Sequence, residues 1–271
     1  MEIPFAKLHE NGNDFIVIDE WDRIVIPDEM KAQFATIYCD RRFGIGADGV
    51  ICVMKSQTCD LRMRLFQPDG SESGVDGNGI RCLAKFAFDA GHTKESCTVE
   101  TPAGEIKVSM GYTGDDFLAT ITMTPPQFDR KDISAGTGKY REKIAGYEVH
   151  LVNTGVPHAV IIVDSVDAVD IEAVAPKILH HKSFRKGTNV SFVEKTGKDR
   201  IRIRTFGRGA EGETLSCGTG ALASAVMVHT LGLTANVVDV ETRGGPLTIS
   251  ITDGVKMKGP ATTVFLGTIP F

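Results

Sequence analysis

The chain of 271 residues is 42% hydrophobic, which is enough apolar content for two cores of ordinary domain size. Its 30 basic and 35 acidic residues give a net charge of −5 and form no long basic block, so nucleic acid is not an expected partner. The apolar runs are too short to span a membrane and the first residues lack an export signal, so we expect a cytoplasmic protein with no membrane partner.

Short runs in which polar and apolar residues alternate predict half-buried strands along most of the chain. In chain order, the predicted strands are 15–19, 61–66, 98–110, 117–123, 148–152, 159–163, 190–194, 200–206, 237–242, 247–251 and 263–271. Glycine-rich turns at 102–104 and 243–245 are expected to join neighbouring strands into hairpins.

Four helices are predicted between these strands. Two amphipathic helices are expected at 27–39 and 171–179, and two central ones at 78–90 and 219–231, each of the latter stopped by a glycine. No charged residue lies between positions 221 and 228, so the last helix must be buried on nearly all sides. A curved antiparallel sheet wrapped around the helix would bury it in this way.

The sequence repeats itself. Residues 61–66 read Leu-Arg-Met-Arg-Leu-Phe and residues 201–206 read Ile-Arg-Ile-Arg-Thr-Phe, an offset of 140 (201 − 61). At an offset of 141, Asp-Gly-Asn-Gly-Ile from Asp76 meets Cys-Gly-Thr-Gly-Ala from Cys217, and Val-Glu-Thr recurs at Val99 and Val240. The repeat predicts an α+β fold of two pseudo-symmetric domains. We place the first at 1–117 with a returning strand at 263–271, and the second at 118–262.

Each copy brings a polar residue followed by Gly-x-Gly to the start of a central helix. A helix start carries unpaired N–H groups and a partial positive charge, which stabilise a bound carboxylate. Two such starts, related by pseudo-two-fold symmetry, are expected to face one bound molecule. A cysteine there has a lowered pKa, so Cys217 is the leading catalytic candidate. The same field is expected to lower the pKa of Asp76 unless burial raises it, and the alternative role of this residue is a plain helix N-cap.

The remaining cysteines and histidines give little sign of a metal or disulfide site. Six cysteines without Cys-x-x-Cys or secreted-scaffold spacing favour reduced thiols, and Cys82, one turn into its helix, is expected in the core. The seven histidines include no His-Glu-x-x-His pattern, so zinc is not expected.

Eight short motifs together resemble the diaminopimelate epimerase family, the cofactor-independent amino-acid epimerases and racemases, over essentially the whole chain. They are Gly12–Phe15, Arg42–Gly49, Asp69–Ser71, Gly77–Cys82, Pro157-His158, Gly187–Val190, Arg208-Gly209 and Gly212–Gly220. The resemblance implies two similar domains, each with a barrel-like antiparallel sheet around a central helix, and one active site in the cleft between them. It also implies that no cofactor is needed.

In that family one cysteine thiolate removes the α-proton from one face of an amino acid while the opposite thiol protonates the other face. Cys217 matches one cysteine of this pair, whereas Asp76 stands where the family has the other. The resemblance further implies that His158 lies near the reacting centre. It implies a substrate-binding set of Asn13, Gln67, Gly77, Asn78, Gly79, Asn189, Gly207, Arg208, Gly218, Thr219 and Gly220.

Within this set, Arg208 is expected to pair with a carboxylate, and Asn78 and Thr219 are expected to offer backbone N–H groups to the α-carboxylate. Besides Asp76, which follows Gly74-Val75, three positions depart from the family pattern. Gly207 replaces a glutamate, Gln67 an asparagine, and Val156 an asparagine found in many members.

Three functions remain open from the sequence. The leading one is a PLP-independent epimerase or racemase acting at Cα, on diaminopimelate or on another amino acid, with Cys217 the dominant group. The same fold with one thiol could instead be a lyase or dehydratase that eliminates a β-substituent. The third is an amino-acid-binding homologue without turnover. In each case the expected partner is a small-molecule amino acid, and a homodimer is the assembly considered.

Overall fold

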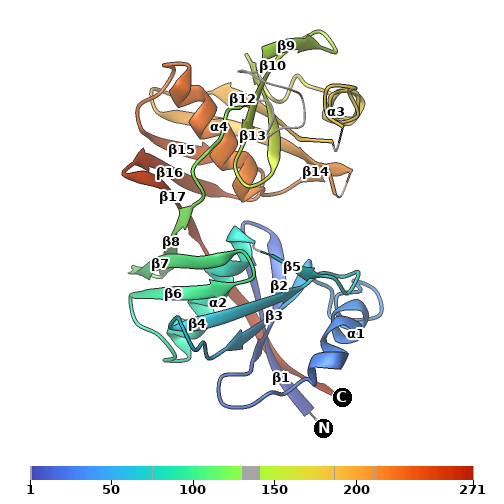
Figure 1. The fold of residues 1–271 in the computed structure, drawn as a ribbon, viewed down its shortest axis with the longest axis vertical. Helices are drawn as coiled ribbons and strands as arrows, with labels where there is room; N and C mark the ends of the chain where they lie inside the picture. Colours follow the sequence, from blue (N-terminus) through green and yellow to red (C-terminus); the bar gives the residue numbers. More distant parts are fainter. Residues whose placement is uncertain (1, 75, 130–140, 186, 210, 271) are drawn as a thin grey trace. The chain divides into compact units, whose positions relative to one another are not determined.

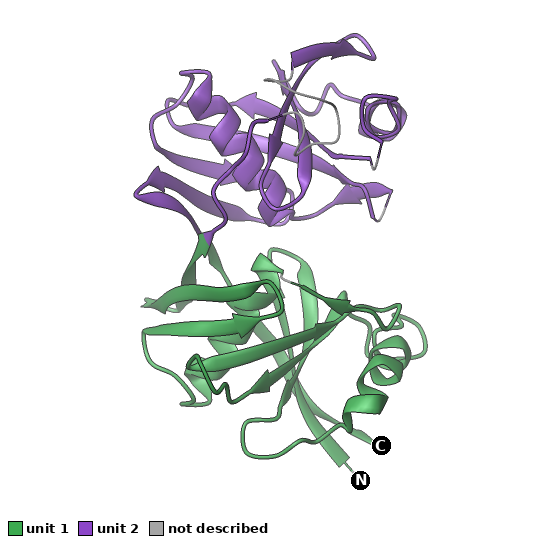
Figure 2. Ribbon diagram, viewed as in Figure 1, with its two compact units in different colours: residues 1–122, 258–271 green, residues 123–257 purple. Residues whose placement is uncertain are grey.

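The computed structural model describes residues 2–74, 76–129, 141–185, 187–209 and 211–270 (Figure 1). The chain forms two compact units, which Figure 2 distinguishes by colour. Unit 1 comprises Met1–Thr122 with Lys258–Phe271, and unit 2 comprises Met123–Met257. Among the described helices, none has both the length and the apolar character that crossing a membrane requires.

Unit 1 is a sheet with one helix packed on each face. Its elements are β1 (Glu2–Glu10), β2 (Asn13–Asp19), α1 (Asp28–Tyr38), β3 (Gly49–Met54), β4 (Leu61–Phe66), β5 (Glu72–Ser73), α2 (Gly77–Asp89), β6 (Ser96–Thr101), β7 (Gly104–Thr113), β8 (Asp116–Met123) and β18 (Thr262–Pro270). Phe34 of α1 packs with Val50 and Cys52 of β3, whereas Ile51 lies against Gly79 of α2. Neighbouring residues of β3 therefore face opposite helices.

Unit 2 repeats this plan. Its elements are β9 (Arg141–Ile144), β10 (Tyr147–Asn153), β11 (Pro157–Val163), α3 (Ile171–Leu179), β12 (Asn189–Lys195), β13 (Arg200–Gly207), β14 (Gly212–Thr214), α4 (Gly218–Thr230), β15 (Val237–Glu241), β16 (Pro246–Thr252) and the first part of β17 (Gly254–Pro260), a strand that the division between the units cuts after Met257. As predicted, α4 is buried along nearly its whole length, and its buried residues include all of 220–228. The outer helix α3 packs through Ile171, Ala175 and Ile178 onto the opposite face of the sheet.

The strand registers of the two units are equivalent. Phe66 pairs with Glu72 in unit 1, and Phe206 pairs with Glu213 in unit 2. Five residues separate the first pair (67–71) and six the second (207–212), so one extra residue in the β13–β14 connection changes the offset from 140 to 141. The duplication seen in the sequence is therefore a duplication of strand pairing.

The predicted α+β class is confirmed, but the sheets are mixed, so the expectation of purely antiparallel sheets was wrong. The pairs β2–β3 and β4–β6 are parallel in unit 1, as are β11–β12 and β13–β15 in unit 2. Each parallel pair is joined through one of the four helices. Parallel neighbours need such a crossover, because a tight hairpin can join only antiparallel strands.

Candidate active site

Asp76 is the N-cap of α2. Its backbone is extended, with φ −141° and ψ 117°, and its Oδ1 accepts hydrogen bonds from Asn78 N at 2.8 Å and Gly79 N at 2.9 Å. The side chain therefore satisfies two of the amides that a helix start leaves unpaired. Those two amides, including the one that we expected Asn78 to offer to a substrate carboxylate, are engaged by the protein's own carboxyl group.

Burial raises the pKa of the Asp76 carboxyl group, against the lowering effect of its two backbone hydrogen bonds and of Arg81. The expected lowering of this pKa was therefore wrong. Desolvation by burial outweighs these lowering contributions. A Cβ at Gly79 would lie 3.5 Å from Ile51 Cδ1, 3.6 Å from Phe15 Cζ and 3.6 Å from Asp76 Cβ.

Cys217 caps α4 with the same backbone conformation, at φ −133° and ψ 100°, but its side chain makes no capping hydrogen bond. Its Sγ lies 3.6 Å from Thr219 Oγ1. The adjoining wall is polar: a Cβ at Gly220 would lie 3.2 Å from Cys217 Sγ, 3.0 Å from Thr205 Oγ1 and 3.2 Å from Ser191 Oγ. Thr205 and Ser191 occupy the positions that Leu65 and Ile51 hold in unit 1.

His158 is fully buried beside this helix start. Burial, and then the charge of Arg208, lower its pKa to about 3, so its imidazole is neutral at neutral pH. Its Nε2 lies 3.0 Å from Thr219 Oγ1 and 3.5 Å from Asn189 Nδ2. Within the described residues its buried Nδ1 has no hydrogen-bond partner. The histidine therefore reaches Cys217 through the Thr219 hydroxyl group.

Asn189 fixes the main chain that carries Arg208. Its Oδ1 accepts a hydrogen bond from Arg208 N at 2.8 Å. Gly187, with φ +70°, lets the arginine side chain pack closely, since a Cβ there would lie 3.0 Å from Arg208 Cδ. His158, Asn189, Arg208, Thr219 and Cys217 are thus neighbours within unit 2.

In unit 1 a chain of hydrogen bonds holds Asn13 and Asn78 together. Asn13 Nδ2 donates to Asp48 Oδ2 at 2.7 Å, and Asn78 Nδ2 donates to Asn13 Oδ1 at 3.0 Å. Arg81 Nη2 donates to Asn78 Oδ1 at 2.6 Å and lies 3.3 Å from Glu10 Oε1, in an ion pair with no exposed surface. Sequence reasoning missed Asp48, Arg81 and Glu10, although the first two stand inside the recognised motifs.

The sequence model described as diaminopimelate epimerase matches residues 5–128 and 150–264. The chain belongs to the diaminopimelate epimerase family. A diaminopimelate epimerase of Methanothrix thermoacetophila is 48% identical over 99% of this chain and 96% of its own length. Another, of Methanocella arvoryzae, is 50% identical over 99% and 97%. The predicted family and its isomerase class are thereby confirmed.

Solved structures with low identity share the fold of this epimerase family member. A phenazine biosynthesis protein of the PhzF family from Bacillus anthracis has a TM-score of 0.72 at 16% identity, covering 100% of both chains. A hydroxyproline epimerase from Agrobacterium vitis has a TM-score of 0.66 at 17% identity, covering 99% of this chain and 92% of its own.

The remaining predicted site residues of this family member are near Asp76 or Cys217 in the amino-acid sequence. Gly77 and Gly218 open α2 and α4. Gln67 follows β4 in a turn, where its N–H donates to Ser71 O at 2.8 Å, and Gly207 ends β13 in a pair with Gly212.

The six cysteines form no disulfide in the part of the chain that the structure describes, and Cys82 is buried as predicted, with burial raising its pKa well above the ordinary value. In the described part of the chain, no cluster of three or more His, Cys, Asp or Glu side chains could hold a metal ion.

Proposed function

We propose that this protein is a PLP-independent epimerase that inverts an α-carbon of diaminopimelate through Cys217 and Asp76. The observation that carries the proposal is the pair of helix starts. They share one backbone conformation but differ in surroundings, since hydroxyl groups adjoin Cys217 and apolar side chains adjoin Asp76. Hydroxyl groups can donate hydrogen bonds to a thiolate in the first setting, whereas burial raises the pKa of the carboxyl group in the second.

In one direction, the Cys217 thiolate takes the α-proton while the Asp76 carboxylic acid delivers a proton to the opposite face of the same carbon. In the other direction, the Asp76 carboxylate is the base and the Cys217 thiol is the acid. The raised pKa of Asp76 supports this exchange, because an acid and a base work best when their pKa values lie near the operating pH.

The substrate α-carboxylate binds at the start of α4 in this proposal. The Cys217 side chain makes no cap there, whereas Asp76 occupies two amides of α2. The positive end of α4 would stabilise the charge that develops on the carboxylate as the α-proton leaves. Gly218 permits the close approach of the substrate to the amides of Thr219 and its neighbours.

His158 acts in this scheme as a positioning residue. Its neutral imidazole can accept at Nε2 from the Thr219 hydroxyl group and the Asn189 amide group, and the Thr219 oxygen can in turn accept from the Cys217 thiol. The tautomer that does so leaves Nδ1 as the buried atom without a partner. This costs less than burying a charged imidazolium.

The other substrate contacts are assigned by position. Asn13, Asn78, Asn189 and Arg208 are held by the hydrogen bonds described above, and we propose that Arg208 binds a carboxylate of the substrate. Gln67 and Gly207 are proposed to face the distal end of the substrate, where their departure from the family pattern can alter substrate preference.

We further propose that the protein is a cytoplasmic homodimer that does not bind nucleic acid. Val264, Phe265 and Leu266 of β18 are exposed in succession, and burying them against a second copy would remove apolar surface from water. Six cysteines without a disulfide among the described residues are expected in a reducing compartment. A net charge of −5 disfavours a polyanion.

Chiral chromatography of reactions with the stereoisomers of diaminopimelate, and then with a panel of other amino acids, tests the proposal. We expect inversion of one centre by the wild type, a loss of at least roughly a thousandfold in Cys217→Ala, and a faster reaction in Asp76→Cys. Release of a keto acid would instead indicate a lyase. Binding without inversion would indicate an amino-acid-binding protein, the alternative that the capping role of Asp76 favours.

A further inference from the structure

Both units carry the same two-pronged ion pair on the sheet face that bears the outer helix. Arg64 Nε and Nη2 donate to the two oxygens of Glu72 at 2.8 and 2.9 Å. Arg204 Nε and Nη2 donate to the two oxygens of Glu213 at 2.7 and 2.8 Å. The arginines are 140 residues apart (204 − 64) and the glutamates 141 (213 − 72), so the pairs are equivalent under the duplication.

Each glutamate stands four residues before a reactive side chain, Glu72 before Asp76 and Glu213 before Cys217. It lies on a very short strand, since β5 has two residues and β14 has three. Strands of this length form too few ladder hydrogen bonds to fix a segment firmly. Two charge-assisted hydrogen bonds to one guanidinium group add the missing constraint and also fix its direction.

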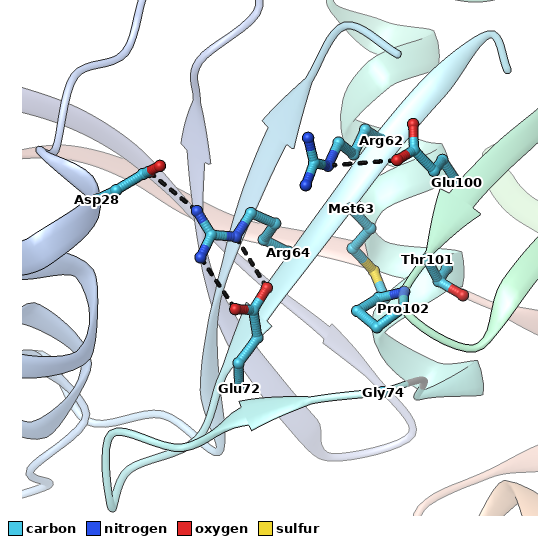
Figure 3. Close-up of a pocket in the computed structure, with 9 residues that line it drawn as sticks. All are labelled: Asp28, Arg62, Met63, Arg64, Glu72, Gly74, Glu100, Thr101 and Pro102. Carbon is cyan, nitrogen blue, oxygen red and sulfur yellow. Dashed lines mark hydrogen bonds and ion pairs between the residues drawn. The ribbon is translucent and has the colours of Figure 1, made fainter. Parts of the chain in front are cut away.

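The arginines also reach the outer layer. Figure 3 shows Arg64 between Glu72 and Asp28, whose Oδ1 accepts from Arg64 Nη1 at 2.9 Å at the start of α1. In unit 2, Arg204 Nη1 donates to the carbonyl oxygens of Val166 at 2.9 Å and Val169 at 3.0 Å, just before α3. Each arginine therefore joins a long strand, the short strand leading to the helix start, and the outer layer.

The two pairs differ in how many further groups hold them. Arg243 Nη1 lies 2.9 Å from Glu213 Oε2, and the neighbouring Gly244 N donates to Leu215 O at 2.8 Å. Pro102 holds the position equivalent to Arg243 (243 − 141), and it lines an open pocket of about 570 Å³ beside Arg64 and Gly74 (Figure 3). The Glu213 side chain is 9% exposed, whereas that of Glu72 is 34% exposed.

We propose that Arg64–Glu72 and Arg204–Glu213 are positioning pairs that set the places of Asp76 and Cys217, and that the second pair holds its segment more tightly. This inference rests on the proposed function of those two side chains. Displacing a reacting group by about 1 Å can reduce a rate roughly a hundredfold, so a pair that fixes the segment contributes to turnover without touching substrate.

Glu213→Gln tests the second pair, because it keeps the side-chain volume and removes the charge. Its matched control is Glu194→Gln. This change removes the 2.7 Å ion pair between Glu194 and Arg202, which lies on β13 like Arg204, and it leaves β14 untouched. The rate at which iodoacetamide alkylates Cys217 is measured against pH by peptide mass spectrometry, with the half-buried Cys59 as internal reference. Turnover constants and melting temperatures are measured in parallel.

We expect Glu213→Gln to shift the alkylation profile of Cys217, but not that of Cys59, and to lower kcat roughly tenfold to a hundredfold with little change in KM. Its melting temperature should match that of Glu194→Gln. Glu72→Gln should lower kcat while leaving the Cys217 profile unchanged, with Glu100→Gln as its control. Arg204→Lys, which keeps the charge but loses the two-pronged geometry, should give an intermediate shift, and it replaces Glu213→Gln if that variant does not fold.

Wild-type alkylation and turnover in both Glu213→Gln and Arg204→Lys would overturn the inference. Alkylation needs no substrate, so a shifted profile in a protein that turns over no amino acid would uphold the positioning pair while rejecting the proposed function. An unshifted profile in an active enzyme would reject the positioning pair while upholding the proposed function.

Discussion

Replacing Gly220 by alanine should strain the site at Cys217, whereas the same change at the equivalent Gly79 should not. At Gly220, the new Cβ would meet Thr205 Oγ1 at 3.0 Å, Cys217 Sγ at 3.2 Å and Ser191 Oγ at 3.2 Å, closer than ordinary contact. At Gly79, the nearest atoms lie at 3.5 and 3.6 Å, which is ordinary van der Waals contact. Overpacking of this kind costs about 1–3 kcal/mol.

Both changes also replace glycine near a helix start, which gains at most about 1 kcal/mol of helix propensity. That gain is common to the two variants, so the difference between their free energies of unfolding measures the cost of the close contacts alone. Urea unfolding should show Gly220→Ala less stable than Gly79→Ala by about 1–3 kcal/mol, with slower alkylation of Cys217 in Gly220→Ala alone. Equal stability of the two variants would refute the close packing described around Cys217.

Three further perturbations act on buried ionisable groups. Asp76→Asn keeps the Oδ1 acceptor and removes a carboxylate whose folded-state pKa is raised. It should therefore stabilise the protein at neutral pH, by an amount that fades as pH falls toward the ordinary value of 3.8, and a gain independent of pH would contradict this. His158 has a folded-state pKa of about 3, below that of the unfolded chain. Its contribution to stability should fall by about 1.4 kcal/mol per pH unit below about 6.5, a slope that His158→Gln removes while the contribution of His150 remains. Glu10→Ala should cost about 3–5 kcal/mol in urea unfolding, because it leaves Arg81 buried without its carboxylate. The exposed Glu148, paired with Arg141, is the control at about 0–1 kcal/mol, and equal losses would show that Arg81 does not need Glu10.

The repeat in the sequence predicted much of the architecture. The central helices, the outer helices and most of the long strands lie within a few residues of their predicted places, because each has a clear periodicity or a glycine stop. Strand β3 was missed because Val50, Ile51, Cys52 and Val53 are all buried between helices on both faces, so polar and apolar residues do not alternate.

The chemistry at Asp76 could not be predicted in the same way. The helix field is visible in the sequence, whereas the apolar wall formed by Phe15 and Ile51 comes from strands distant in the chain. The two walls differ because Ile51 is replaced by Ser191 in the second copy. The signal for that difference was present in the repeat, but only the strand registers show which residues to compare.

The amino-acid sequence predicted only part of the Arg64–Glu72 and Arg204–Glu213 pairs. The Arg-x-Arg of each copy lies within the repeat at an offset of 140, and the two glutamates are equivalent at the offset of 141. Assigning each glutamate to its arginine requires the registers of β4 with β5 and of β13 with β14. The strands β5 and β14 are too short for the sequence to predict these registers.

The central claim is that Asp76 and Cys217 serve opposite faces of one α-carbon. Its most direct test is the incorporation of solvent deuterium at Cα of diaminopimelate in D₂O, followed by mass spectrometry and chiral separation. Because each group protonates its own face, we predict that the wild type places one deuterium in the inverted product. Cys217→Ala and Asp76→Ala should each abolish inversion. Inversion that persists in Asp76→Ala at the wild-type rate would contradict the account.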